Sequence, residues 1–255
     1  MEKAVLSATD LKLSFGGLQA VDGVSLEVFP DDLIALVGPN GSGKTCVLNM
    51  LNNVYHGTGT VMLEDKDISG LSPYKIAALG IGRAFQMVEL FGHMTVLDNL
   101  LLGCHTQMKS DLFSCGLYWG WFAQKEELAF REWVEEIIDF FEIARLRKQL
   151  VNNLPFGAQK LVGVARALIM KPKIILLDEP SSGMNRQEKE DFARFLLRIK
   201  YTLHIPMLWV EHDIKMVTDL ADRILVLEQG RKIADGSPEE IVANPEVIRA
   251  YLGTS

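Results

Sequence analysis

A glycine-rich segment provides the clearest chemical signal in the sequence. It matches the pattern G-x-x-x-x-G-K-[ST] and consists of Gly38, Pro39, Asn40, Gly41, Ser42, Gly43, Lys44 and Thr45. The glycines allow the backbone to curl, so that successive N–H groups point at one phosphate group. Lys44 adds a positive charge for the β and γ phosphates, and the Thr45 hydroxyl can bind Mg²⁺. These residues predict a site for a nucleoside triphosphate with Mg²⁺.

The sequence on either side of this segment favours a phosphate site over a glycine-rich turn without a ligand. The apolar run LIALVG at 33–38 predicts a strand buried on both faces, and KTCVLNMLNN at 44–53 predicts a helix. The positive end of that helix would add to the attraction for phosphate. Cys46 stands where a hydroxyl would bond the α-phosphate. Because a thiol is a weaker donor, we expect a small loss of affinity.

Two carboxylates end a second apolar run. The run KIILLDE at 173–179 predicts a central parallel strand with Asp178 and Glu179 at its C-terminal end. In open α/β sheets ligands bind beyond that edge, where the glycine-rich segment also emerges. Asp178 can then hold Mg²⁺, and Glu179 can polarise an attacking water. Taken alone, two solvated carboxylates at a strand end are as plausible as a catalytic pair.

Two further side chains are candidates whose roles the sequence leaves open. His212 follows the apolar run IPMLWVE at 205–211, where an imidazole can contact a γ-phosphate and orient the water, or can be structural. Gln86 can bind Mg²⁺ through its amide oxygen and sense the γ-phosphate. The candidate catalytic residues are therefore Glu179, His212 and Gln86, and the candidate Mg²⁺ ligands are Thr45, Gln86 and Asp178.

The elements that must position these residues indicate an α/β fold. Alternation in LKLSF and VSLEVF predicts antiparallel strands with one wet face near the N-terminus. The apolar runs at 33–38, 173–179 and 205–211 predict parallel strands, each followed by helical sequence. Towards the C-terminus, LEQGRKIADG predicts a hairpin, and two short helices are expected to begin at prolines.

The middle of the chain differs in pattern. From about Thr95 to Met170 it is mostly helical in periodicity, with no comparable buried strand. We therefore expect one domain over residues 1–255. Its α/β core, at about 1–86 and 172–255, would carry an inserted helical subdomain at about 87–171.

The composition argues against several classes of protein. The 255 residues carry a net charge of −7, so we expect no nucleic-acid partner. Cys46, Cys104 and Cys115 show no metal-binding or disulfide spacing, and no signal sequence is evident, which favours reduced thiols in the cytosol. No window approaches the roughly 18 apolar residues of a membrane span. We expect that the protein does not cross a membrane itself.

The order of these motifs resembles that of the ATP-binding subunits of ABC transporters. GPNGSGKT resembles the Walker A loop, SSGMN the D-loop, Asp178 and Glu179 the Walker B pair, Gln86 the Q-loop glutamine and His212 the switch histidine. Phe15 stands where the family has an aromatic that stacks on adenine. The resemblance covers nearly the whole chain. It implies ATP and Mg²⁺, a P-loop NTPase core of the RecA-like type with an N-terminal antiparallel β-subdomain, and a sandwich dimer that hydrolyses ATP.

Within the family, the chain is most similar to the ATP-binding subunits of branched-chain amino-acid importers. The likeness is carried by FGGLQAVDGVSLEV, GIGRAFQMVELFGHMTVLDNLLLG, DEPSSGMN and NPEVIRAYLG. It implies integral-membrane permease subunits, a solute-binding protein reached through them, and a place on the cytoplasmic face of the cell membrane. Relatives for urea, amides or other small solutes share much of the pattern and remain alternatives.

Two readings outside transport also remain. A soluble ABC ATPase of translation or DNA repair would usually carry tandem units or long coiled-coil insertions, and this chain has neither. A non-catalytic nucleotide-binding regulator would be suggested by the loss of Glu179 or His212, and both are present. An ATPase subunit of a transporter is therefore the favoured interpretation.

The family signature LSGGQ is altered in this chain. Its place is taken by Leu154, Pro155, Phe156, Gly157 and Ala158, with Gln159 following. Pro155 removes a hydroxyl and an N–H, Phe156 adds bulk, and Ala158 lacks the glutamine amide. The Gly157 amide and the N-terminus of an expected helix at 158–170 remain for a phosphate bound to the opposite subunit. We expect the chain to work mainly as half of a heterodimer, with a homodimer as the alternative.

Two apolar segments of the middle region are candidates for contact with a permease. The segment 87–99 would line the groove for a coupling helix, or would pack in the core. The residues offered to that groove are Met87, Leu90, Phe91 and Met94. The aromatic cluster at 118–122 would contact a permease or the membrane interface, or would form the local core of the helical subdomain.

Overall fold

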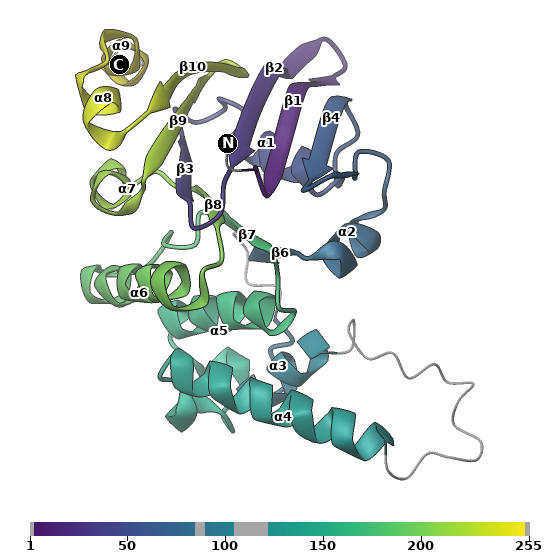
Figure 1. Ribbon diagram of the computed structural model, residues 1–255. Coiled ribbons are helices and arrows are strands. Elements are labelled where there is room, and N and C mark those ends of the chain that lie inside the picture. The colour runs from purple at the N-terminus through teal and green to yellow at the C-terminus, as the bar shows by residue number, and fades with distance from the viewer. Residues whose placement is uncertain (1–2, 85–89, 105–121, 253–255) are drawn as a thin grey trace.

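The larger sheet of the computed structural model forms the centre of the molecule (Figure 1). The structure describes residues 3–84, 90–104 and 122–252. The strands of this sheet are β3 (Leu33–Val37), β6 (Ile81–Ala84), β7 (Ile174–Asp178), β8 (Met207–Val210), β9 (Arg223–Glu228) and β10 (Arg231–Gly236). In the order β10-β9-β3-β8-β7-β6, neighbouring strands are parallel except for the antiparallel hairpin of β9 and β10. The predicted parallel strands and hairpin are confirmed.

A smaller antiparallel sheet lies beside the first one. It consists of β1 (Leu6–Phe15), β2 (Leu18–Val28), β4 (Thr58–Leu63) and β5 (Lys66–Asp67), in the order β2-β1-β4-β5. The burial of β1 and β2 alternates over much of their length, as expected for strands with one face in water. The predicted N-terminal antiparallel strands are confirmed.

Helices cover both sheets and form most of the described part of the middle segment. They are α1 (Lys44–Leu51), α2 (Pro73–Leu79), α3 (Val96–Cys104), α4 (Phe122–Phe140), α5 (Phe156–Ile169), α6 (Arg186–Arg198), α7 (Ile214–Leu220), α8 (Pro238–Ala243) and α9 (Pro245–Leu252). Figure 1 shows α3 and α4 at the end of the molecule away from β1 and β2. Within the described parts of the chain, no helix has the length and hydrophobicity needed to cross a bilayer.

The central strands alternate between two hydrophobic clusters. Leu33, Ala35 and Val37 of β3 pack on the side of α5 and α6, whereas Ile34 and Leu36 pack on the side of β1, β2 and α1. Strands β7 and β8 alternate in the same way, because successive side chains of a strand point to opposite faces. Every residue of β3, β7 and β8 is therefore buried. Burial on both faces explains why these strands read as unbroken apolar runs.

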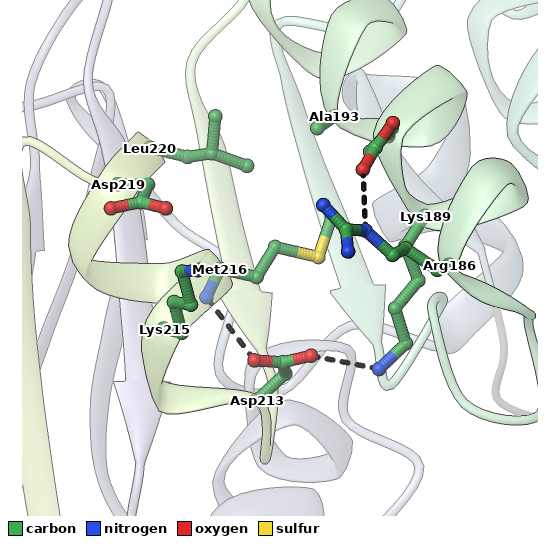
Figure 2. Close-up of a pocket in the computed structure, with 9 residues that line it drawn as sticks. Arg186, Lys189, Ala193, Asp213, Lys215, Met216, Asp219 and Leu220 are labelled. Carbon is green, nitrogen blue, oxygen red and sulfur yellow. Dashed lines mark hydrogen bonds and ion pairs between the residues drawn. The ribbon is translucent and has the colours of Figure 1, made fainter.

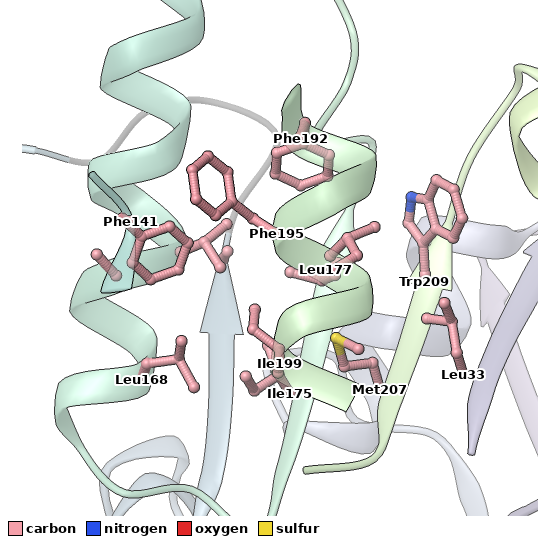
Figure 3. Packing of buried hydrophobic residues seen from close by; sticks show 14 of the residues in the cluster. Leu33, Phe141, Leu168, Ile175, Leu177, Phe192, Phe195, Ile199, Met207 and Trp209 are labelled. Atoms are coloured by element: carbon pink, nitrogen blue, oxygen red, sulfur yellow. The ribbon is translucent and has the colours of Figure 1, made fainter. Parts of the chain in front are cut away.

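The helical segment shares the core of the larger sheet. Phe141, which follows α4, lies with its ring centroid 5.3 Å from that of Phe195 in α6. Both belong to the cluster that contains Leu168 of α5 and Leu177 of β7 (Figure 3). The predicted fold class, an α/β core with an antiparallel β-subdomain and an inserted helical part, is confirmed. The residue boundaries of the two parts stay a prediction.

Several elements were not predicted from the sequence. Strand β6 contains Gly82 and Arg83, so its sequence is not an apolar run. The strand is nevertheless largely buried, because neighbouring elements cover it. The first half of β4 is exposed, so its sequence does not show the alternation of apolar and polar residues that predicts a strand. Helix α5 begins at Phe156, two positions before the predicted start, with Pro155 as its N-cap residue.

A buried ion pair joins β6, at the edge of the larger sheet, to its neighbour β7. Arg83 of β6 contacts Asp178 at the end of β7, with 3.2 Å between Nη2 and Oδ2, and the two side chains are 7% and 4% exposed. Burial raises the pKa of the Asp178 carboxyl, and the charge and hydrogen bond of Arg83 oppose this shift. The guanidinium therefore favours the ionised form of Asp178 and offsets part of the effect of burial.

We predict that Arg83→Met lowers the free energy of unfolding by about 3–5 kcal/mol, because it leaves the Asp178 carboxylate buried without its partner. The double variant Arg83→Met/Asp178→Asn should recover part of this loss, since it removes the unpaired charge. Urea denaturation of the two variants measures the difference. The control Arg186→Met, which breaks an exposed pair with Glu190, should change stability by less than about 0.5 kcal/mol. A single variant as stable as the parent would contradict the prediction.

Candidate active site

The glycine-rich loop between β3 and α1 has a backbone that only glycine can supply. Gly38 and Gly43 have φ values of 149° and 100°, and Gly43 is the N-cap residue of α1. A Cβ at Gly38 would lie 2.1 Å from the Leu227 carbonyl oxygen, and one at Gly43 would lie 2.4 Å from that of Ala20. The loop is therefore enclosed by β9 and by the start of β2. Its N–H groups and the N-terminus of α1 form a cradle suited to phosphate.

Two buried side chains, Ser42 of this loop and Lys44 at the start of α1, are poised for an anion. Lys44 is 5% exposed, and its Nζ donates to the carbonyl oxygens of Gly38 and Pro39 at 2.9 and 3.0 Å. Burial lowers the pKa of Lys44, and the charges of Glu179 and Asp178 oppose that shift. Among the described residues, the buried Ser42 hydroxyl has no hydrogen-bond partner. A buried cation and an unpaired hydroxyl beside a glycine cradle fit a bound triphosphate.

One cavity of about 670 Å³ brings most of the predicted site residues together. Its lining includes the predicted residues Phe15, Asn40, Gly41, Gly43, Lys44, Thr45, Cys46, Glu179 and His212. Gly38, Pro39 and Ser42 do not line it and instead shape the loop beneath. Leu18, Gln19, Ala20 and Gln229 also line it and were not predicted. This volume lies in the range typical of small-molecule sites.

Phe15, which lines this cavity, forms an aromatic pair with Tyr55, which does not. Phe15 is 48% exposed, and Tyr55 packs edge-on against it, with 5.3 Å between ring centroids and an interplanar angle of 84°. Tyr55 was not predicted as a site residue, since it follows α1 at a position without a motif. Its contact holds Phe15 in one orientation and leaves much of that ring free to stack on a planar ligand.

The carboxylates after β7 have different surroundings. Asp178 is 3% exposed, contacts Arg83, and accepts a long hydrogen bond from Thr45 Oγ1 at 3.4 Å. Glu179 has a left-handed backbone with φ of 46°, although its N–H still donates to the Val210 carbonyl at 3.0 Å. A positive φ at a non-glycine residue costs free energy and turns this side chain out of the strand direction. The turn aims the carboxylate of Glu179 into the cavity.

His212 lies against Glu179. The imidazole Nε2 of His212 pairs with Oε1 of Glu179, and both side chains line the cavity that holds Lys44 and Thr45. A carboxylate paired with an imidazole next to a phosphate cradle has the composition of a general base and its orienting group. The sequence placed these residues 33 positions apart in the chain, and the sheet brings them into contact.

The oxygen atoms of Thr45 and Asp178 fit a small divalent cation whose other coordination positions are filled by phosphate and water oxygens. The described residues contain no group of three His, Cys, Asp or Glu side chains arranged for a metal. Thr45 and Asp178 supply two oxygen ligands side by side. Mg²⁺ is commonly held by one or two protein oxygens plus phosphates and waters. Gln86, the third predicted ligand, lies outside the described residues.

The altered signature lies apart from the cavity. Gly157 is buried in the first turn of α5, and a Cβ placed on it would lie 2.5 Å from Oε1 of Glu188. Phe156 is 46% exposed, and its ring packs against Gly183 of the segment 181–185. The cavity of this chain therefore contains no part of the segment 154–158. A nucleotide bound in this cavity would therefore not contact Gly157.

Comparison with known proteins extends these observations over the whole chain. A family model described as ABC transporter matches residues 21–182, and one described as branched-chain amino acid ATP-binding cassette transporter matches residues 231–255. The chain is 40% identical to the high-affinity branched-chain amino acid transport ATP-binding protein LivG of Escherichia coli (strain K12), over 99% of both chains. It is 36% identical to BraF of Pseudomonas aeruginosa, a protein of the same description, again over 99% of both chains.

Solved structures agree with the sequence relatives. An ATP-binding cassette of an ABC transporter in its ADP conformation has a TM-score of 0.84 and 31% identity, and the similarity covers 99% of each chain. The family model spans more than half of this chain, and its relatives match it from end to end. Together with the glycine cradle, the Glu179–His212 pair and the shared cavity, these findings show that the chain belongs to the ABC transporter family, as one of its ATP-hydrolysing cassettes.

Proposed function

We propose that the chain is the ATP-hydrolysing subunit of an importer for branched-chain or related hydrophobic amino acids. The observation that carries the ATPase part is the single cavity in which Lys44 and Thr45 lie with Glu179 and His212. The choice of amino acid rests on the full-length similarity to branched-chain transport subunits and on the match of residues 231–255.

The loop 38–43 and the start of α1 would bind the triphosphate of ATP. Lys44 would exchange its two backbone carbonyl acceptors for phosphate oxygens, and the Ser42 hydroxyl would gain an acceptor. Phe15 would stack on adenine, with Tyr55 holding the ring from its edge. Cys46 stays a neutral thiol at pH 7, because burial raises its pKa, so it offers only a weak bond to phosphate.

The polar groups at the C-terminal ends of β7 and β8, together with Thr45 and Gln86, would carry out hydrolysis. Thr45 and Asp178, with Gln86, would hold Mg²⁺, which neutralises charge on the β and γ phosphates when bound. Glu179 would accept a proton from the attacking water. His212 would contact the γ-phosphate and hold the Glu179 carboxylate in place.

The signature loop, residues 154–158, supports a partnership between unlike subunits. Pro155 offers neither a hydroxyl nor an N–H to a phosphate, and α5 has no side-chain cap. The Glu188 carboxylate already lies over Gly157, so an incoming phosphate would meet a negative charge there. Such a loop closes weakly over ATP bound by another subunit. A second ATP-binding subunit with an unaltered signature would then complete this chain's own site.

A second cavity supports docking of membrane permease subunits. This coupling groove has a volume of about 360 Å³ and is lined by Asn52, Val54, Pro73, Ala77, Ile81, Arg83, Phe91, Leu102, Gly103, Arg166, Ala167 and Met170. Phe91, one of the four residues expected to offer a docking surface, lines this groove and is 57% exposed. Leu90 instead packs against the core, Met94 is half-buried, and Met87 lies outside the described residues, as does the part of the aromatic cluster at 118–121. Phe122 begins α4.

The coupling groove also touches the active site. Arg83 lines the groove and pairs with Asp178 on its inner side. A permease helix that presses on the groove would therefore act on a group next to the Mg²⁺ ligands. Permease subunits would hold the chain at the cytoplasmic face of the membrane, and through them it would serve a solute-binding protein.

For the catalytic assignment, we predict that Glu179→Gln lowers ATP turnover about 100-fold or more, since it removes the proton acceptor. The affinity for ATP should stay within a few-fold, because the phosphate cradle is unchanged. Steady-state turnover and binding of a fluorescent ATP analogue measure the two effects. The control Glu246→Gln, an exposed carboxylate on α9, should behave as the parent. Undiminished turnover in Glu179→Gln would exclude Glu179 as the base.

For permease docking, we predict that Phe91→Glu reduces co-purification with polytopic membrane proteins by about tenfold or more, because it places a charge at the edge of an apolar groove. ATP affinity should not change. Leu128→Glu is the matched control, since Leu128 is similarly exposed at 54% but lies on α4, outside the groove. Equal recovery of membrane subunits by the two variants would argue against this docking surface.

For the subunit arrangement, we predict that the chain alone hydrolyses ATP at least about tenfold more slowly than the chain with its partner subunit, as expected for one lost charge-assisted hydrogen bond. The double variant Pro155→Ser/Phe156→Gly should speed up the isolated chain. Pro155→Ala restores the backbone N–H but adds no hydroxyl and leaves the ring of Phe156 in place, so it separates the effect of the N–H from the other two. A lone chain that dimerises on ATP and turns over at the full rate would refute the heterodimer.

A further inference from the structure

A buried carboxylate outside the predicted site connects two of its loops. Glu211 follows β8 and is 3% exposed. Its Oε1 accepts hydrogen bonds from the backbone N–H of Ser181, at 3.1 Å, and from the Ser181 hydroxyl. Its Oε2 accepts from the backbone N–H groups of His212, at 2.8 Å, and Asp213, at 3.3 Å. Four donors from two separate segments thus meet on one side chain.

These two segments flank the Glu179–His212 contact. Ser181 begins the D-loop, residues 181–185, two positions after Glu179. The switch loop, residues 211–213, carries His212. Because Glu211 binds Ser181 and the His212 backbone together, it fixes the spacing between the segments that present the carboxylate and the imidazole. A carboxylate that receives four donors at a buried position is held in one rotamer.

A second ion pair ties the same two segments farther out. Asp213 accepts from Lys189 of α6, with 2.7 Å between Nζ and Oδ2, and from the Met216 N–H at the start of α7 (Figure 2). Lys189 lies on the helix that follows the D-loop. The switch loop is therefore attached to the D-loop side by Glu211 within the core and by Asp213 near the surface.

A buried lysine balances the charge around Glu211. Lys160 of α5 is 4% exposed, three residues after Gly157 of the signature loop. Burial lowers the pKa of Lys160, and the negative charges of Glu179, Glu211 and Asp178 oppose that shift. The Nζ of Lys160 also lies 5.3 Å from the centroid of the Phe156 ring. The carboxylate at 211 is thus compensated by hydrogen bonds and by a nearby cation, as a buried charge requires.

We propose that Glu211 is a positioning residue for ATP hydrolysis, which holds the His212 imidazole against Glu179 by joining the switch loop to Ser181 of the D-loop. This inference rests on the proposed roles of Glu179 and His212. It assigns no contact between Glu211 and nucleotide, since Glu211 does not line the cavity. Movement of the D-loop would shift the imidazole through Glu211.

The test is Glu211→Gln, which keeps the shape of the side chain but presents an amide NH₂ where one carboxylate oxygen accepts two hydrogen bonds. In the assembly in which the parent turns over ATP, we expect kcat to fall about tenfold or more. The ATP affinity should stay within about threefold, because the phosphate cradle is intact. Ser181→Ala removes only the hydroxyl on the same carboxylate and should lower kcat by about threefold or more.

The decisive comparison uses the His212→Ala background. If Glu211 acts through His212, Glu211→Gln should cause little further loss of kcat once His212 is absent. Full additivity, an equal fall in ATP affinity, or an unchanged kcat with a lower unfolding temperature would each overturn the proposal. Should Glu211→Gln not fold, Ser181→Ala in both backgrounds gives the same test. Turnover that persists in Glu179→Gln would instead indicate failure of the proposed function itself.

Discussion

Burial of the larger sheet on both faces is the constraint on which the rest of the structure depends. Strands β3, β7 and β8 run parallel and side by side, and all their residues are buried. Parallel strands end at the same edge, so the segments that leave them meet in space. The glycine-rich loop follows β3, the two carboxylates end β7, and the switch loop follows β8. The candidate active site is the consequence of three strands that share one direction.

That edge concentrates charge in a place that the hydrophobic layers shield from water. Asp178 and Glu211 are almost fully buried, and so are Lys44 and Lys160. Each buried charge needs an ion-pair partner or hydrogen bonds. Without them, loss of its hydration would destabilise the folded state by roughly several kcal/mol. Arg83 serves Asp178 from β6, and the backbone N–H groups of the switch loop serve Glu211. The same contacts that stabilise the carboxylates also set the relative positions of the loops that line the candidate active site.

The coupling groove and the signature loop lie at two different borders of this charged edge. Arg83 lines the groove. Lys160 lies over the ring of Phe156, the first residue of α5. A permease on one side and a second ATP-binding subunit on the other would therefore act on neighbours of Asp178 and Glu179. In the proposed assembly, these side-chain contacts would form a short route from the permease to the site of hydrolysis.

Motif residues were predictable because their chemistry is local. The glycine cradle depends on positive φ values within one short loop, and the apolar runs of β3, β7 and β8 report burial on both faces directly. Arg83 and Glu211 could not be assigned in this way. Each stands in a short segment, GRAF or WVEHD, where a charged residue beside an apolar run is equally consistent with exposure. Their partners, Asp178 and Ser181, are 95 and 30 positions away in the chain.

The sequence by itself determined the phosphate cradle, the order of the motifs, the α/β class and the departures in the signature loop, since each depends on residue type and local spacing. Only the tertiary structure decided that Glu179 contacts His212, that Tyr55 braces Phe15, that Glu188 covers Gly157, and that Glu211 joins two loops. The physical reason is that these contacts connect segments whose proximity comes from sheet order and packing. Hydrophobic burial determines the order of the strands in the sheet. No local sequence pattern predicts which buried charge will contact which donor.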